Sequence, residues 1–166
     1  MLRGARTGGL TDIMRVITWL GSPVWLNIVF AVACVALFLF RAWRSLLFLV
    51  LASPGAVLMV QLVKHLVERH RPSGLHLVHA GGASWPSGHA SSSAALYGAL
   101  FLIVVRSGAL GTRVHRRVAA LAVGALLALI GFSRVYLGVH YPTDVVAAWL
   151  LVAGWLNAVR YADQRW

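Results

Sequence analysis

The chain is predicted to fold as an all-α helical bundle that is embedded in a membrane. Its residues are 60% hydrophobic and only 11% charged, and its mean hydropathy is +0.78, which lies outside the range of ordinary soluble domains. Five apolar runs are separated by polar or arginine-bearing breaks. The alternating ten-residue segments of a β-barrel do not occur, so each apolar run is expected to be a helix.

The five apolar runs are each somewhat shorter than the roughly 20 residues that a spanning helix needs. They are residues 24–40, 46–63, 90–105, 118–132 and 145–159. We therefore expect every helix to extend into flanking residues, and residues 1–166 to form one membrane-embedded domain. Residues 1–22 lack the order of a cleavable signal peptide, and Thr11, Asp12 and Arg15 interrupt their apolar positions. That segment is predicted to lie at the membrane surface.

The basic residues indicate how the chain is oriented. Its formal net charge is +11, which in a soluble protein would suggest binding to nucleic acid. Here the arginines lie at the ends of apolar runs, so membrane phospholipids are the predicted partners and nucleic acid is not. When five crossings alternate, eight arginines fall on one face: Arg41, Arg44, Arg106, Arg113, Arg116, Arg117, Arg160 and Arg165. The positive-inside tendency makes that face cytoplasmic. Segments 65–88 and 133–144 are then predicted to face the periplasm or cell exterior.

Residues 85–96, WPSGHASSSAAL, place a histidine and four serines at the start of an apolar run. Ser87 is predicted to be the N-cap of a helix, with Gly88 and His89 in the first turn. The free N–H groups of a first turn and the positive end of the helix dipole favour an anion, so His89 is expected to lie beside one. The serines at 91–93 are interpreted as a small-residue surface for helix packing.

Lys64 and Arg71 are seven residues apart, which is two helical turns, so both cations share one face if the helix continues. Lys64 is the only lysine among 15 basic residues. A compact ammonium at this one position indicates a specific contact with a negative group. The alternative is that both side chains snorkel from a helix end towards the membrane surface. Glu68 and Arg69, which lie between them, are interpreted as solvated charges without a role.

Arg134, His140 and Asp144 precede the last apolar run. Pro142 suits a first helical turn, which puts Asp144 at a helix N-terminus from which its carboxylate can reach back to His140. A carboxylate on one ring nitrogen fixes the tautomer and leaves the other nitrogen free to act. A structural cap is the alternative for Asp144. Together the three segments offer two histidines, one carboxylate and three cations on one membrane face, which suits the binding and cleavage of a phosphate.

The order K-x6-R-P, P-S-G-H and S-R-x5-H-x3-D resembles the signature of the type 2 phosphatidic acid phosphatase superfamily, and every position is filled. The resemblance implies a lipid phosphatase in which His140 is the nucleophile and forms a phosphohistidine, Asp144 orients His140, and His89 is the general acid. It also implies that no metal or other cofactor is used. The residues that it assigns to the phosphoryl oxygens are Lys64, Arg71, Ser87, Gly88 and Arg134. Membrane members commonly have six spanning helices, whereas this chain shows five.

The expected substrate is a lipid phosphate or diphosphate, because the polar segments border apolar helices and the lipid tail can remain in the membrane. The resemblance suggests polyprenyl phosphates or diphosphates and phosphatidylglycerol phosphate. Three alternatives stay open: a lipid phosphotransferase, a non-catalytic lipid-phosphate binder or transporter, and a metal hydrolase. The metal hydrolase would use the several histidines of this face, but the sequence has no His-Glu-x-x-His pattern and no cysteine near them.

Overall fold

The computed structural model describes residues 8–74 and 76–163, and within these ranges all regular structure is helical. The helices are α1 (Gly8–Trp19), α2 (Pro23–Leu39), α3 (Trp43–Val67), α4 (Gly88–Arg106), α5 (Arg113–Tyr136) and α6 (Pro142–Asp163). Among these described residues, five segments are long and apolar enough to cross a membrane, and the first of them runs through α1 and α2. Each extends beyond its apolar run, as the sequence predicted, because a full crossing needs about 20 residues.

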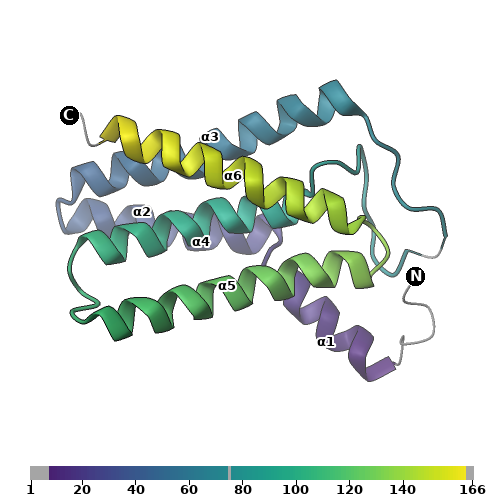
Figure 1. Cartoon of the computed structure of the whole chain (residues 1–166), viewed down its shortest axis with the longest axis horizontal. Coiled ribbons are helices and arrows are strands. Elements are labelled where there is room, and N and C mark those ends of the chain that lie inside the picture. Colours follow the sequence, from purple (N-terminus) through teal and green to yellow (C-terminus); the bar gives the residue numbers. More distant parts are fainter. Residues whose placement is uncertain (1–7, 75, 164–166) are drawn as a thin grey trace.

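Helices α2 to α6 lie side by side with alternating directions, and α1 is inclined away from them at one end (Figure 1). Helix α4 packs against α2, α3, α5 and α6 and is therefore the centre of the bundle. Its buried side chains are mostly small, which allows neighbouring backbones to approach closely. They include Ala90, Ser91, Ser93, Ala94, Ala95 and Ala99. The prediction that the serines serve packing agrees with the burial of Ser91 and Ser93.

The alternation brings the three sequence motifs to the same end of the bundle. The last turn of α3, the first turn of α4, the last turn of α5 and the first turn of α6 all meet there (Figure 1). The loop between α3 and α4 covers this end. At the opposite end lie the short α2–α3 and α4–α5 connections with their arginines. Seven of the eight arginines named above are described, and Arg165 lies outside the described residues.

Helix α1 is part of the segment that the sequence assigns to the membrane surface. Met14 is buried against Tyr136 and Leu137, so α1 packs on the end of α5. The hydroxyl of Thr11 lies 3.2 Å from that of Tyr136, and Thr18 is also buried. The helix is therefore anchored at the end of the bundle that carries the motifs. Its position relative to a bilayer stays a prediction, and residues 1–7 lie outside the described residues.

Candidate active site

A cavity of about 680 Å³ opens at the end of the bundle where the motifs meet. Each motif contributes to its lining. The motif residues that line it are Lys64, Arg71, Gly88, His89, Arg134 and His140. Segments that are up to 76 residues apart in the chain, from position 64 to position 140, thus form one polar cavity at the end of an apolar bundle.

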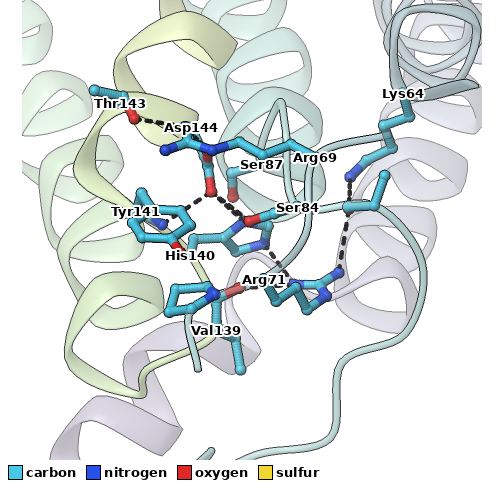
Figure 2. Close-up of polar contacts among 12 residues, drawn as sticks. Lys64, Arg69, Arg71, Ser84, Ser87, Val139, His140, Tyr141, Thr143 and Asp144 are labelled. Carbon is cyan, nitrogen blue, oxygen red and sulfur yellow. Dashed lines mark hydrogen bonds and ion pairs between the residues drawn. The ribbon is translucent and has the colours of Figure 1, made fainter. Parts of the chain in front are cut away.

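His140 and Asp144 form the predicted pair at the start of α6. Because the helix begins at Pro142, the carboxylate of Asp144 turns back towards the imidazole, and Nδ1 of His140 lies 3.3 Å from Oδ2. His140 exposes only 4% of its surface and Asp144 none. The backbone N–H of Tyr141 also donates to Oδ2, at 2.9 Å. The pair is shown in Figure 2 with its surrounding contacts.

The other ring nitrogen of His140 faces a cation. Nη1 of Arg71 lies 3.3 Å from Nε2. A guanidinium can only donate, so Nε2 accepts, and the ring proton is on Nδ1, which points to Asp144. Burial lowers the pKa of His140 below its usual range, although the hydrogen bond with Asp144 opposes this effect. The ring is therefore neutral near pH 7, and the electron pair of Nε2 is directed at Arg71.

Arg71 is held almost entirely by backbone carbonyls. Its Nη1 donates to Val139 at 2.8 Å, its Nη2 to Gly81 at 2.6 Å and its Nε to Gly82 at 3.1 Å. These neutral acceptors orient the guanidinium without neutralising it. Burial lowers the pKa of Arg71, and the nearby carboxylate of Asp144 raises it. An arginine stays protonated under all such conditions, so the cavity has a fixed positive charge beside Nε2 of His140.

Lys64 and Arg134 are also fixed by neutral partners. Nζ of Lys64 donates to the carbonyl of Ala83 at 2.7 Å, which directs the ammonium into the loop that covers the cavity. Nη1 of Arg134 donates to Oγ1 of Thr18 at 2.8 Å. Arg134 exposes 4% of its surface, and its Nε has no partner among the described residues. Helix α1 thus orients one of the cations that the sequence assigned to phosphate binding.

Ser87 occupies the N-cap position of α4, as predicted, but its side chain makes no capping hydrogen bond. Its hydroxyl is buried without a partner in the described chain. The backbone N–H of Ser87 instead donates to the carbonyl of Asp144 at 3.0 Å, which joins the starts of α4 and α6. A Cβ at Gly88 would come no nearer than 4.0 Å to the Cε atom of Lys64. In the first turn of α4, Gly88 and His89 line the cavity.

The interpretation of Arg69 as a solvated charge is wrong, because its side chain is paired with the buried Asp144. Its Nη1 donates to Oδ1 of Asp144 and to Oγ1 of Thr143, both at 2.8 Å. Its guanidinium lies over the ring of Tyr141, 4.1 Å from the ring centroid. Glu68, in contrast, is exposed, as expected.

Sequence reasoning also missed Ser84. This serine is fully buried, and its hydroxyl donates to Oδ2 of Asp144 at 2.5 Å. Arg69 and Ser84 meet Asp144 from 75 and 60 residues away in the chain, so no local spacing could reveal either contact. A physical argument could have indicated them: a buried carboxylate next to a neutral histidine needs a cation and further hydrogen-bond donors.

The additional histidines do not form a metal centre among the described residues. His65, His70 and His79 also line the cavity. Within residues 8–74 and 76–163, no three histidine, cysteine, aspartate or glutamate side chains are arranged to hold a metal ion. The cation-rich part of the cavity, with the unprotonated Nε2 of His140, instead suits a phosphate group.

The chain is similar in sequence and in fold to proteins with known names. The chain is 32% identical over 143 residues to phosphatidylglycerophosphatase B of Bacillus subtilis, covering 86% of this chain and 70% of that protein. A crystal structure of a transmembrane PAP2-type phosphatidylglycerolphosphate phosphatase from Bacillus subtilis matches 96% of this chain and 79% of its own, with a TM-score of 0.88 and 30% identity. Over 75 residues, which are 45% of this chain and 30% of the relative, it is 36% identical to an undecaprenyl-diphosphatase of Sulfolobus acidocaldarius.

The family comparison covers most of the bundle. Residues 42–166 match the model of the PAP2 superfamily, and this range contains all three motifs and every residue that lines the cavity. Because the match spans more than half of the chain, and the similar proteins carry the names of lipid phosphatases, the protein belongs to the PAP2 superfamily.

Proposed function

We propose that this protein is a lipid phosphatase that hydrolyses a lipid phosphate or diphosphate monoester through a phosphohistidine intermediate. One observation carries the proposal: Nε2 of His140 faces the guanidinium of Arg71 at the cavity, while Nδ1 is held by the carboxylate of Asp144. A neutral imidazole with Nδ1 held by a carboxylate and an unprotonated Nε2 at the cavity is an activated nucleophile. The cations beside it favour the binding of a phosphate.

In the first step, Nε2 of His140 attacks the phosphorus atom. A bond forms between Nε2 and the terminal phosphorus, and the bond from that phosphorus to the leaving oxygen breaks. The leaving oxygen belongs to the lipid alcohol in a monophosphate and to the inner phosphate in a diphosphate. Positive charge develops on the imidazole and is stabilised by Asp144, as in other histidine–carboxylate pairs. His89 donates a proton to the leaving oxygen. The equatorial oxygens are bound by Lys64, Arg71 and Arg134. Gly88 in the first turn of α4 and the N-cap residue Ser87 complete the binding site.

In the second step, water attacks the phosphorus atom of the phosphohistidine. His89, which has lost its proton, accepts one from the water, and the bond to Nε2 breaks. Inorganic phosphate is released, and His140 regains its electron pair. The same residue thus acts first as acid and then as base, which restores the starting state without any further reactant.

The substrate is proposed to be a lipid. The cavity lies at the end of an apolar bundle, so a lipid tail can stay in the membrane while the phosphate reaches the cations. The leading candidates are phosphatidylglycerol phosphate and polyprenyl phosphates or diphosphates, which agree with the names of the similar proteins from Bacillus subtilis and Sulfolobus acidocaldarius.

The mechanism is tested with the variant His140→Ala. We expect phosphate release from purified lipid phosphates in detergent to fall by at least about 10³-fold, because the nucleophile is absent. Wild-type protein quenched during turnover of a ³²P-labelled lipid should contain acid-labile label that the variant lacks. His115→Ala is the matched control, since His115 is exposed at the opposite end of the bundle. Near-normal turnover by His140→Ala would remove the mechanism.

The same assay separates the competing functions. A phosphotransferase would transfer label to added acceptor lipid instead of releasing phosphate, and a non-catalytic binder would retain the lipid unchanged. Activity that survives chelation would agree with chemistry that uses only the cations of the chain. A soluble short-chain ester cleaved as efficiently as the lipids would contradict the lipid specificity.

We also propose that the cavity faces the periplasm or cell exterior. The arginines at the other end of the bundle support this orientation through the positive-inside tendency. In intact cells, an impermeant thiol reagent should label Gly81→Cys but not Gly111→Cys, both placed in a Cys34→Ser background. The opposite labelling pattern would reverse the orientation. Permeabilised cells, in which both cysteines should react, provide the control.

A further inference from the structure

The carboxylate of Asp144 accepts more hydrogen bonds than the pairing with His140 requires. Oδ1 accepts from Arg69 at 2.8 Å. Oδ2 accepts from Ser84 at 2.5 Å and from the backbone N–H of Tyr141 at 2.9 Å, whereas Nδ1 of His140 is farther away, at 3.3 Å. Two of these donors, Arg69 and Ser84, come from the segment between α3 and α4 and not from the segment that carries the histidine (Figure 2).

Arg69 supplies the charge that this buried carboxylate needs. Asp144 is completely buried, and an unpaired carboxylate in such a place is costly. His140 is neutral in the resting state, as its contact with Arg71 requires, so it provides no compensating charge. Arg69 is the cation in direct contact with Asp144. Because Arg69 compensates the negative charge, Asp144 stays ionised while the proton on Nδ1 remains on the imidazole.

The position of Arg69 is itself determined by the segment around His140. Thr143 accepts a hydrogen bond from the same Nη1 atom that contacts Asp144, and the ring of Tyr141 lies under the guanidinium. A planar guanidinium can stack and donate in this way, whereas a lysine ammonium provides charge without the plane. Arg69 thus joins the end of α3 to the first turn of α6.

Ser84 restricts the other oxygen of the carboxylate. Its hydroxyl lies 3.5 Å from Nδ1 of His140 and donates to Oδ2, so it is beside the contact between the imidazole and the carboxylate. The backbone N–H of Ser84 donates to the carbonyl of Arg69 at 2.7 Å, so the two residues are fixed to each other. Because Arg69 and Ser84 occupy both oxygens, the carboxylate cannot rotate away from His140 without breaking these contacts.

We propose that Arg69 and Ser84 are positioning residues that hold the carboxylate of Asp144 and, through it, the tautomer and orientation of His140. This inference rests on the proposed function for its kinetic test. It assigns a role to two residues outside the three motifs. Arg69 also borders the cavity, so direct binding of the substrate phosphate is the competing role, and the experiment must distinguish the two.

The kinetic test uses Arg69→Gln and Ser84→Ala in purified, folded protein. We expect kcat to fall by about 10- to 100-fold, as for other residues that orient an active group, while KM changes by less than about threefold. Arg69→Lys should recover part of the lost kcat, because it restores the charge but not the planar contact. Matched controls are Arg15→Gln, which breaks the exposed Arg15–Asp12 pair, and Ser73→Ala, an exposed serine of the same loop.

A double-mutant cycle identifies the route of the effect. If Arg69 acts only through the carboxylate, adding Arg69→Gln to Asp144→Asn should cause almost no further loss of kcat. A multiplicative loss, or a KM that rises at least as much as kcat falls, would overturn the positioning role in favour of direct phosphate binding. The conservative Arg69→Lys variant serves the same cycle if Arg69→Gln does not fold.

The titration of His140 tests the contacts without any turnover. The ring is followed by NMR in substrate-free protein and assigned by comparison with His140→Ala. Removing the cation of Arg69 should raise the pKa of His140, whereas Arg69→Lys should leave it near the wild-type value. The other charged or titratable groups around the ring, Arg71, Arg134, His89 and Asp144, are unchanged in both variants. An identical titration in wild type and Arg69→Gln would overturn the inference, even if His140 proves to be the nucleophile.

Discussion

Arginines at the two ends of the bundle have opposite environments. At the cavity end, Arg134 exposes 4% of its surface, and Arg71 is half-buried with backbone carbonyls around it. At the other end the arginines are exposed. These are Arg41, Arg44, Arg106, Arg113, Arg116, Arg117 and Arg160. One residue type thus occurs both as an oriented charge inside a cavity and as a solvated charge at a membrane boundary.

The difference lies in what the cations contact. Lys64, Arg71 and Arg134 donate to carbonyls or to a hydroxyl, which fix the direction of the side chain and leave its charge available. The arginines at the other end are exposed, and the orientation proposed above depends on the charge that they place at that end. The direction of each side chain therefore matters at the cavity end, whereas the role proposed for the other end depends on the total charge.

Removal of one arginine from each end should give the largest contrast. We expect Arg71→Gln to reduce kcat/KM for a lipid phosphate by about 10²- to 10³-fold, because a preorganised donor beside Nε2 is lost. Arg116→Gln should leave kcat/KM within about twofold, since surface substitutions rarely affect a distant site. Steady-state phosphate release from both purified variants provides the measurement. Similar losses at the two ends would break the comparison.

Threonine substitutions sharpen the comparison at a smaller scale. Thr18→Val removes the acceptor that orients Arg134. Turnover should then fall by about tenfold, which corresponds to one lost hydrogen bond to a charged group. Thr112 caps α5 at the opposite end through the N–H of His115, so Thr112→Val should cost about 1 kcal/mol of stability and leave turnover unchanged. Thermal unfolding and phosphate release distinguish the two effects, and a stability loss without slower turnover in Thr18→Val would contradict the role of α1.

The smallest expected effect is a shift in the pH profile. Burial lowers the pKa of His140, so the ring loses its free electron pair only when the pH falls below the usual histidine value of about 6.5. The acidic limb of kcat/KM should therefore have its midpoint below pH 6.5, and activity should persist at pH 6.5. NMR titration of His140 without substrate separates this event from ionisation of the phosphate. A histidine midpoint above pH 6.5 would contradict the buried, neutral ring.

Much of the site was predictable because its residues are close in sequence to helix ends. The four-residue spacing of His140 and Asp144 and the helix-starting Pro142 predicted their contact correctly. The seven-residue spacing of Lys64 and Arg71 did not predict its geometry, because α3 ends at Val67 and Arg71 lies beyond the helix. Both cations still reach the cavity, because the loop folds back over the end of the bundle and its carbonyls bind them.

The sequence by itself determined the membrane bundle and the grouping of the three motifs at one end. Those properties depend on hydropathy, on alternation of crossings and on local spacing, which are all readable along the chain. Only the tertiary structure decided that Arg69 and Ser84 hold Asp144 and that Thr18 holds Arg134. These contacts join residues 60 to 116 positions apart, and a buried charge takes its partner from whichever segment packing brings within hydrogen-bond distance.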